Sequence, residues 1–292
     1  MLNNAPIINN FHYNDYAISL LRLDLIHPQI SGNKWFKLKY NLERASQLQK
    51  DTIITFGGAF SNHIAATAYA CKLKGFKCIG IIRGEASAIN NYTLQKAQDN
   101  GMEFMFVSRE DYKQKDQADY LNNLQIQFPN AYLIPEGGDN ALGQKGCEEI
   151  LTDATTPFTH VFCAYGTGTT LKGISKALVP NQQLTGIHVL KYDLAVELPQ
   201  TIILNEYHFG GYAKHTQELL EFKDWFEENF NTALDYVYTA KVAYAIFDLI
   251  KKNKLSKQDK ILMIHTGGLQ GNAGYEARYN LKPSRQVNDP QG

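Results

Sequence analysis

Three lysines, Lys34, Lys37 and Lys39, lie within six residues of one another in the segment SGNKWFKLKY. A lysine amine can attack a carbonyl carbon, so it can hold a carbonyl cofactor through a covalent bond. Lys34 directly follows Gly32 and Asn33, a turn-forming pair, and is therefore the lysine best placed to point into a cleft. Lys37 and Lys39 are expected to be solvated. The alternative interpretation is that all three lysines lie on the charged, solvent-exposed side of a helix and have no chemical role.

Four glycine-rich segments follow predicted strands: GGAFSNH after 52–57, PEGGDN after 131–134, YGTGTT after 160–164 and TGG after 260–265. Ligands of open α/β sheets bind beyond the carboxyl ends of the strands. Glycine allows a backbone to approach a ligand closely. One such loop is commonly only a tight turn, whereas four of them together favour a ligand site.

The third of these loops has the composition of a phosphate site and runs into a helix-forming segment. It consists of Gly166, Thr167, Gly168, Thr169 and Thr170. Backbone N–H groups at a helix start favour an anion, and the threonine hydroxyls add donors. A dinucleotide fingerprint would need glycine where Leu171 stands, and a Walker motif is absent, so a single phosphate fits better. A phosphate site together with Lys34 suggests pyridoxal 5'-phosphate (PLP) as the cofactor.

The elements that must position these residues alternate regularly along the chain. Short β-branched runs predict strands at 52–57, 77–82, 103–107, 131–134, 160–164, 184–190 and 260–265. Helical segments are predicted at 61–75, 91–101, 140–153, 169–178, 214–229 and 240–253. Strands separated by helices predict an α/β fold with parallel sheets and helices on both faces. The last dozen residues are polar and are expected to be loosely ordered.

Composition limits the class of protein. The 292 residues are enough for two domains, and 44% of them are hydrophobic. Lys+Arg and Asp+Glu both number 29, which argues against nucleic acid or an anionic membrane as the main partner. The four cysteines form no CxxC pair, so no metal site is expected. We expect no signal peptide and no membrane span, and therefore a cytoplasmic protein.

Six short segments combine into one set of motifs: SGNKWFKLKY, FSNH, YGTGTT, GGYAKHT, DYVYTAKV and HTGG. Together they resemble the D-cysteine desulfhydrase and 1-aminocyclopropane-1-carboxylate (ACC) deaminase family over residues 15–280. The resemblance implies the tryptophan synthase β-like PLP fold (fold type II), with two parallel-sheet α/β domains and the active site in the cleft between them. It also implies a large PLP-binding domain, 1–40 and 151–292, a small α/β domain, 41–150, and a homodimer.

The cofactor roles implied by the resemblance begin with Lys34, which would hold PLP and then move a proton at the substrate Cα. Asn62 would donate a hydrogen bond to the phenolate oxygen of the cofactor. The loop at 166–170 would bind the phosphate, and Thr239 would face the pyridine nitrogen. The family pattern differs at three places, because Ser31, Phe36 and Lys39 stand where the family has glycine, arginine and glutamate. The segment between Tyr192 and Tyr212 also looks shortened.

The substrate roles implied by the resemblance involve two other motifs. Ser61, Asn62 and His63 would meet the substrate carboxylate at the start of a helix, with Ser61 also counted as catalytic. Tyr238 would lie near the ring and the substrate, and Tyr212 would face the reacting carbons. Two of these residues have simpler interpretations. His63 could be only a polar residue in a first helical turn, and Tyr212 could serve only in packing.

Two positions bear on which reaction is catalysed. Thr239 stands where ACC deaminases carry glutamate, and a threonine hydroxyl that donates to an unprotonated ring nitrogen gives a weaker electron sink. Thr266 stands where ACC deaminases carry leucine, and it is counted as substrate-binding. Both favour β-elimination from a small D-amino acid, D-cysteine giving pyruvate, ammonia and sulfide. ACC deamination to 2-oxobutyrate is one alternative, and an α/β protein that binds a phosphorylated ligand without catalysis is another.

Two further residues could be mistaken for catalysts. His265 ends an apolar strand and is expected to be a satisfied core histidine. Cys163 lies within another apolar strand and is expected to be a small buried residue rather than a nucleophile.

Overall fold

The chain forms two compact units in the computed structural model, which describes residues 6–284 except 31, 87–88, 90 and 192–196. The first unit contains residues 1–33 and 147–292, and the second contains residues 34–146. The chain therefore enters the second unit between Asn33 and Lys34 and leaves it between Gly146 and Cys147. The predicted assignment of PLP binding to a domain of 1–40 and 151–292 stays a prediction.

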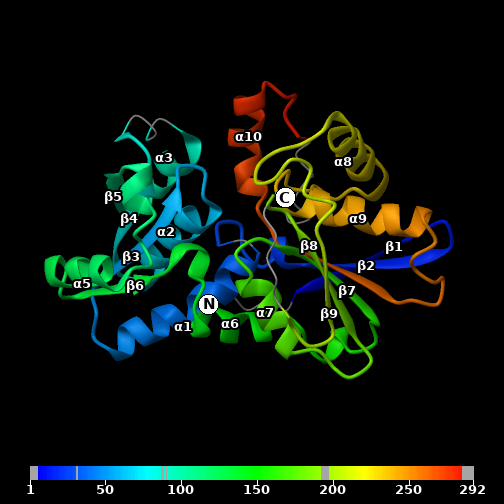
Figure 1. Ribbon diagram of the computed structural model, residues 1–292, viewed down its shortest axis with the longest axis horizontal. Helices are drawn as coiled ribbons and strands as arrows, with labels where there is room; N and C mark the ends of the chain where they lie inside the picture. Colours follow the sequence, from blue (N-terminus) through cyan, green and yellow to red (C-terminus); the bar gives the residue numbers. More distant parts are fainter. Residues whose placement is uncertain (1–5, 31, 87–88, 90, 192–196, 285–292) are drawn as a thin grey trace. The chain divides into compact units, whose positions relative to one another are not determined.

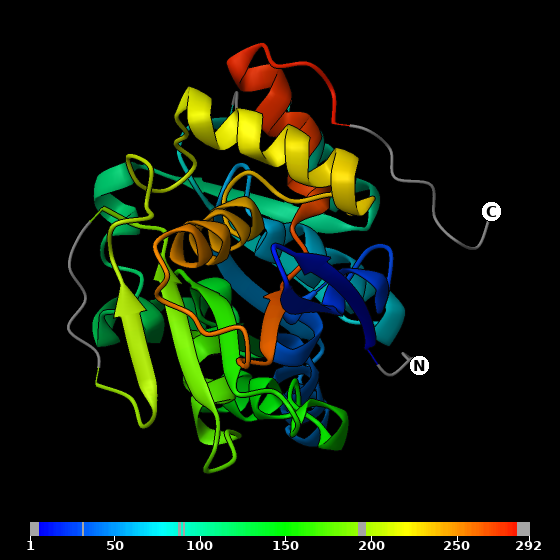
Figure 2. The ribbon, with the colours of Figure 1, turned by 90° about the vertical axis from the view of Figure 1, so that its right-hand side faces the viewer.

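The first unit is built on a six-stranded sheet with strand order β1-β2-β10-β7-β8-β9 (Figure 1). Its strands are β1 (Ile7–Tyr13), β2 (Tyr16–Arg22), β7 (His160–Tyr165), β8 (Gln183–His188), β9 (Thr201–Leu204) and β10 (Ile261–His265). All neighbours are parallel except β1, which pairs antiparallel with β2. Figure 2 shows this β1–β2 hairpin, in dark blue, at the edge of the sheet beside β10.

The helices of the first unit include four that follow its strands or loops: α7 (Thr169–Lys176), α8 (Gln217–Phe230), α9 (Thr239–Lys251) and α10 (Asn272–Tyr279). Helix α9 packs against β7, β8 and β10. It is apolar along most of its length, and Val242, Ile246 and Phe247 belong to the core of this unit. Burial of this face fixes the start of α9, where two of the predicted site residues lie.

The second unit is built on a four-stranded parallel sheet with strand order β5-β4-β3-β6. Its strands are β3 (Thr52–Gly58), β4 (Lys77–Arg83), β5 (Met102–Val107) and β6 (Ala131–Ile134). The helices are α1 (Asn33–Gln47), which leads into the unit, α2 (Asn62–Lys74), α3 (Tyr92–Asp99), α4 (Arg109–Tyr112), α5 (Ala118–Gln127) and α6 (Ala141–Glu148), which leads out. Ile54 and Phe56 of β3 and Ile79 and Ile81 of β4 belong to its core.

The predicted alternation of strands and helices is confirmed, and so is the α/β fold class. The predicted strand 52–57 is β3, Thr52–Gly58, and the predicted helix 91–101 is α3, Tyr92–Asp99. The β1–β2 hairpin and β9 were not predicted, so the larger sheet is mixed rather than purely parallel. In the described part of the chain, no helix is long and apolar enough to cross a membrane.

The two residues that could be mistaken for catalysts are both in the core. His265 is fully buried, with Nε2 2.8 Å from the Ala233 carbonyl oxygen and Nδ1 3.1 Å from Asp24 Oδ1. Burial acts to raise the pKa of Asp24, but His265 and Arg22 outweigh it and lower that pKa. Cys163 is fully buried in β7. The predicted burial of His265 and Cys163 is confirmed, and the prediction that neither is a catalyst stays a prediction.

Candidate active site

The turn before Lys34 is tied to two loops of the first unit. The Gly32 N–H donates to the Leu23 carbonyl oxygen at 2.9 Å, and the Asn33 N–H donates to the Thr266 carbonyl oxygen at 3.2 Å. The Asn33 side chain donates through Nδ2 to Thr170 Oγ1 at 2.8 Å. Residue 31, the serine of the SGNK motif, lies outside the described residues. Lys34 is half-buried, and the residue before it in the chain, Asn33, contacts the predicted phosphate loop.

Gly32 is the tightest point of this anchor. Its φ is +70°, and a Cβ placed on it would lie 1.9 Å from the Thr266 carbonyl oxygen. No other residue type can occupy this position without a backbone shift. The loop that contains Thr266 therefore sets where the chain turns into Lys34.

The predicted phosphate loop joins β7 to α7. Gly168 is the N-cap residue of α7 with a φ of +98°, and Thr169 and Thr170 are buried in the first helical turn. Thr167 Oγ1 and Thr169 Oγ1 lie 3.2 Å apart. The first turn of α7 contains no acidic residue. The helix start therefore keeps its positive end for an anion.

Lys172 is a loop neighbour that the sequence analysis did not single out. A methyl group placed on Gly168 would lie 3.3 Å from Lys172 Cε and 3.7 Å from its Nζ. An ammonium group this close to the loop adds positive charge where a phosphate would bind. Its signal in the sequence is its place four residues after Gly168, one helical turn along.

The start of α9 brings together three of the predicted residues. The Tyr238 and Tyr212 rings lie 6.3 Å apart at an interplanar angle of 67°. A Cβ placed on Gly166 would lie 3.2 Å from Tyr238 Cε1, so Tyr238 also borders the phosphate loop. Thr239 follows in the chain and is fully buried, whereas Tyr212 is 49% exposed. The first unit thus gathers Tyr212, Tyr238, Thr239 and the loop at 166–170.

Asp235, a buried carboxylate that the sequence analysis missed, organises this helix start. Its Oδ1 accepts hydrogen bonds from the Thr239 N–H and the Thr239 hydroxyl, both at 2.8 Å. Its Oδ2 accepts from the N–H groups of Val237 and Tyr238, both at 2.9 Å. The Thr239 hydroxyl proton therefore points at Asp235. The expectation that this hydroxyl donates to a ring nitrogen would require the proton to leave Asp235.

In the second unit, the FSNH motif opens helix α2. Ser61 is the N-cap residue, and its Oγ accepts a long hydrogen bond of 3.4 Å from the Ile64 N–H. The Asn62 side-chain oxygen is buried without a hydrogen-bond partner. Rotating the amide exchanges its oxygen and nitrogen, so Asn62 presents one unsatisfied buried polar atom in either orientation. Such an atom is expected where a polar ligand binds.

His63 is buried in the same helical turn and is held in one tautomer. Its Nε2 lies 2.9 Å from Thr55 Oγ1, and that hydroxyl donates to the Ile134 carbonyl oxygen at 2.9 Å. The hydroxyl proton is therefore used, so His63 Nε2 must carry the hydrogen. His63 Nδ1 is buried with no partner and is left as an acceptor. This tautomer suits a ligand N–H donor, whereas the resemblance predicted a carboxylate.

Burial lowers the pKa of His63 to about 3, and the positive charges of Lys37 and Lys34 lower it further in the same direction. His63 is therefore neutral at neutral pH. The expectation that Lys37 is solvated is wrong, because Lys37 is only 6% exposed. It lies beside Gly138, where a Cβ would be 3.1 Å from Lys37 Cβ. Lys39 is half-buried, with Nζ 4.8 Å from the Tyr40 ring centroid.

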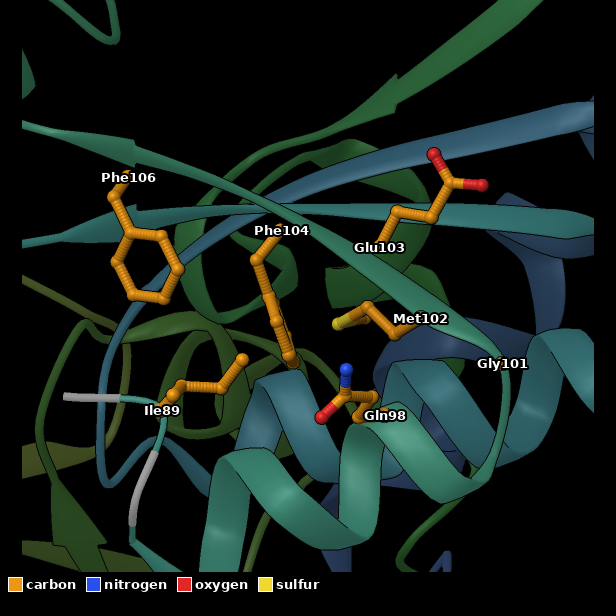
Figure 3. Close-up of a pocket in the computed structure, with 7 residues that line it drawn as sticks. All are labelled: Ile89, Gln98, Gly101, Met102, Glu103, Phe104 and Phe106. Atoms are coloured by element: carbon orange, nitrogen blue, oxygen red, sulfur yellow. The ribbon is translucent and has the colours of Figure 1, made fainter. Parts of the chain in front are cut away.

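A separate pocket of the second unit lies between β5 and α3 (Figure 3). Phe104 and Phe106 of β5 and Gln98 of α3 line it together with Ile89, Gly101, Met102 and Glu103. None of the predicted site residues is among them. This pocket therefore has no part in the predicted site.

Comparison with known proteins decides the family. Residues 13–200 match the model of the family described as "Pyridoxal-phosphate dependent enzyme". The chain belongs to this family. A Pyrococcus horikoshii protein, provisionally named a 1-aminocyclopropane-1-carboxylate deaminase, is 31% identical to it, over 88% of this chain and 86% of the relative. The D-cysteine desulfhydrase of Serratia proteamaculans is 26% identical, over 90% of this chain and 91% of the relative.

A solved structure described as an ACC deaminase homologue superimposes with a TM-score of 0.82. It is 26% identical and covers 95% of this chain and 93% of that one. The chain is thus a PLP-dependent enzyme with fold type II relatives, and its cofactor is pyridoxal 5'-phosphate. The alternative of a non-catalytic binding protein is wrong.

The described residues fit this cofactor. Gly166 and Gly168 carry no side chain in the phosphate loop, and the start of α7 offers N–H donors to an anion. Asn62 retains an unsatisfied buried polar atom of the kind that the phenolate oxygen would engage. The role of each residue toward PLP stays a prediction.

Replacing Lys172 by methionine should weaken PLP binding, because the positive charge beside the cofactor phosphate is lost. A partly exposed charge pair contributes about 0.5–1 kcal/mol, so we expect about a twofold to fivefold higher PLP dissociation constant at low salt. The difference should shrink as salt is added. PLP titration of the apoenzyme, followed by absorbance, measures it. Lys176→Met, at the end of the same helix, is the control; equal effects of the two changes would contradict the assignment.

The neutral state of His63 should make the protein acid-sensitive. Between pH 3 and 6.5 an unfolded histidine takes up a proton that the native one refuses, so stability falls as pH falls. From pH 6.5 to 5 this residue should account for about 1.5 kcal/mol of lost unfolding free energy. Urea unfolding of the wild type and of His63→Asn across this range measures it. Parallel pH curves would show that His63 protonates normally.

Proposed function

We propose that this enzyme is a lyase that removes a β-substituent from a small D-amino acid, with D-cysteine and water giving pyruvate, ammonia and sulfide. The observation that carries the choice is Thr239, a neutral side chain where a glutamate is expected for ring opening of ACC. The Serratia relative, named a D-cysteine desulfhydrase, supports the same reaction.

Lys34 is the residue to which we assign covalent attachment of the cofactor and proton transfer at the substrate Cα. When bound, PLP withdraws electrons from Cα and makes the Cα proton acidic. Support comes from the anchor of Gly32 and Asn33, which fixes the backbone directly before Lys34. An amine held on a fixed backbone can reach the same atom in each turnover.

The substrate amino acid is assigned to the start of α2, where donors and an acceptor occur together. Ser61 and the first N–H groups of α2 suit a carboxylate. His63 Nδ1 is an acceptor that suits the ammonium group of the substrate rather than its carboxylate. Both ends of an α-amino acid thus find matching partners within three residues.

Elimination tolerates a weaker electron sink than ring opening does, because the electrons leave with the β-substituent. A fully buried hydroxyl such as that of Thr239 cannot balance a buried positive charge as a carboxylate can. Thr266, also buried, matches the desulfhydrase pattern. We therefore place D-cysteine, or another D-amino acid with a β-leaving group, ahead of ACC.

ACC deamination to 2-oxobutyrate and ammonia is the second candidate, and one contact favours it. The Asp235 carboxylate lies 2.8 Å from the Thr239 hydroxyl, so a negative charge is present one hydrogen bond behind that residue. The Thr239 oxygen already accepts a hydrogen bond from the Asp235 N–H at 2.7 Å, so it has one lone pair left to accept from a protonated ring nitrogen. The Pyrococcus relative and the solved homologue are named for this activity.

A panel of substrates separates the two candidates. The purified enzyme with PLP would be given D-cysteine, L-cysteine, D-serine, β-chloro-D-alanine and ACC, and the 2-oxo acids would be separated by chromatography. We expect pyruvate from D-cysteine and β-chloro-D-alanine and little 2-oxobutyrate from ACC. The Lys34→Ala protein is the blank for chemistry of free PLP. Dominant 2-oxobutyrate from ACC would replace the first candidate by the second.

A homodimer is a further part of the proposal, and it rests on the family resemblance. Sedimentation equilibrium of the PLP-bound enzyme should give twice the chain mass of 33.0 kDa. A single species at the chain mass would refute it.

A further inference from the structure

The turn that presents Tyr212 has an unusual backbone. Four of its residues have positive φ: Phe209 at 50°, Gly210 at 90°, Gly211 at 109° and Ala213 at 51°. Phe209 and Ala213 are not glycines, so each costs about 1 kcal/mol in this conformation. Inside the turn, the Gly211 N–H donates to the His208 carbonyl oxygen at 3.0 Å and the Gly210 N–H donates to His208 Nδ1 at 2.9 Å. A turn of this kind persists only where surrounding groups hold it.

The Tyr279 hydroxyl donates to the Ala213 carbonyl oxygen of this turn at 2.8 Å, and Lys241 is the second group that holds it. Its side chain is fully buried in α9, and Nζ donates to the carbonyl oxygens of His208 and Gly211, both at 2.8 Å. Burial lowers the pKa of Lys241 to about 8, and Asp235 acts in the opposite direction. Burying an amine is unfavourable unless its hydrogen bonds are made, and here two of them go to this turn.

The position of Lys241 in the chain links the turn to the proposed site. Tyr238, Thr239 and Lys241 lie within four residues at the start of α9. The same helix start thus presents Tyr238 and holds the turn of Tyr212. The ring centroids of these two tyrosines lie 6.3 Å apart. Tyr212 is 49% exposed, so few packed neighbours fix its side chain. Its position therefore depends more on the backbone of the turn than the position of a core residue does.

We propose that Lys241 is a positioning residue that holds the 208–213 turn so that Tyr212 faces Tyr238 and the reacting carbons. This inference rests on the proposed function, because it takes the role of Tyr212 from there. Lys241 touches neither substrate nor cofactor in this account. A buried lysine that served stability alone would affect folding, whereas this one affects turnover through Tyr212.

A double-mutant cycle tests the inference with the PLP-bound enzyme. The variants are Lys241→Met, Tyr212→Phe and the double change, with kcat and KM measured on the best substrate of the panel. A misplaced group costs about 10- to 100-fold in turnover, so we expect each single change to lower kcat by about that factor. The double variant should be no slower than Tyr212→Phe alone, because Lys241 then has nothing left to position.

Two further measurements separate positioning from general damage. Hydrogen exchange of the peptide that contains the 208–213 turn should rise in Lys241→Met, while PLP affinity stays at the wild-type value. Lys251→Met, an exposed lysine of the same helix, should change neither. If Lys241→Met fails to fold, Lys241→Gln, a polar side chain that is uncharged and one atom shorter, takes its place in the cycle.

The outcomes distinguish the inference from the function on which it rests. If Tyr212→Phe is slow but Lys241→Met is not, or if the two factors multiply in the double variant, the inference fails and the function stands. If Tyr212→Phe turns over like the wild type, the proposed role of Tyr212 is wrong, and the inference falls with it.

Discussion

Lys34→Ala is expected to abolish the visible absorption band of bound PLP and to lower turnover by about 10³-fold or more. The change removes both the covalent attachment and the group that moves the Cα proton, and loss of one general acid–base group alone costs about 10²- to 10⁴-fold. The fold should survive, because Lys34 is half-buried and the hydrogen bonds of its anchor come from Gly32 and Asn33. Absorbance, circular dichroism and steady-state kinetics measure the three effects.

The matched control for this change is Lys39→Ala. Lys37 is unsuitable because it is buried, so its removal would disturb packing whatever its function. Lys39 lies in the same helix and is half-buried, as Lys34 is. A band that persists in Lys34→Ala and disappears in Lys39→Ala would move the attachment to Lys39.

Gly32→Ala is expected to have the second large effect, a loss of stability of about 3 kcal/mol or more together with loss of the PLP band. A Cβ at this position would meet three backbone atoms: the Thr266 oxygen at 1.9 Å, the Thr266 carbon at 2.5 Å and Gly267 Cα at 2.8 Å. Backbone atoms cannot move aside as the end of a flexible side chain can. The turn into Lys34 must therefore shift.

Gly75→Ala is the control that isolates the contact from the backbone conformation. Gly75 has a φ of +75°, close to the +70° of Gly32, but a Cβ there would meet nothing within 4 Å. It should cost only the left-handed conformation, about 1–2 kcal/mol, and should keep the PLP band. Urea unfolding of both variants gives the comparison. Equal losses would show that the Thr266 contact contributes nothing.

Much of the fold follows from the sequence, because long β-branched runs and helical periods are local signals. The β3–α2–β4 unit is an example, with a buried strand, a serine N-cap and Gly75 at the helix end. The β1–β2 hairpin was missed because β1, IINNFHY, is mostly exposed and mixes asparagines with apolar residues. Strand β9 has only four residues, TIIL, too few for a reliable period.

The predicted site depends on contacts between distant parts of the chain, and sequence patterns do not show those. Lys37 looked solvated because its own segment is charged, yet it is buried beside Gly138, a hundred residues away. Lys241 donates to two backbone carbonyls, which leave no mark on the residue types involved. Asp235 did leave a signal, since an aspartate side chain commonly accepts a hydrogen bond from the backbone N–H two residues on, here that of Val237.

Identification of the lysine that bears the cofactor tests the central claim most directly. The PLP-bound enzyme would be reduced with borohydride, digested and analysed by tandem mass spectrometry for the pyridoxyl phosphate mass. The account predicts that mass on the peptide with Asn33 and Trp35, with fragment ions that place it on Lys34. The same mass on Lys37, Lys172 or Lys241 instead would contradict it.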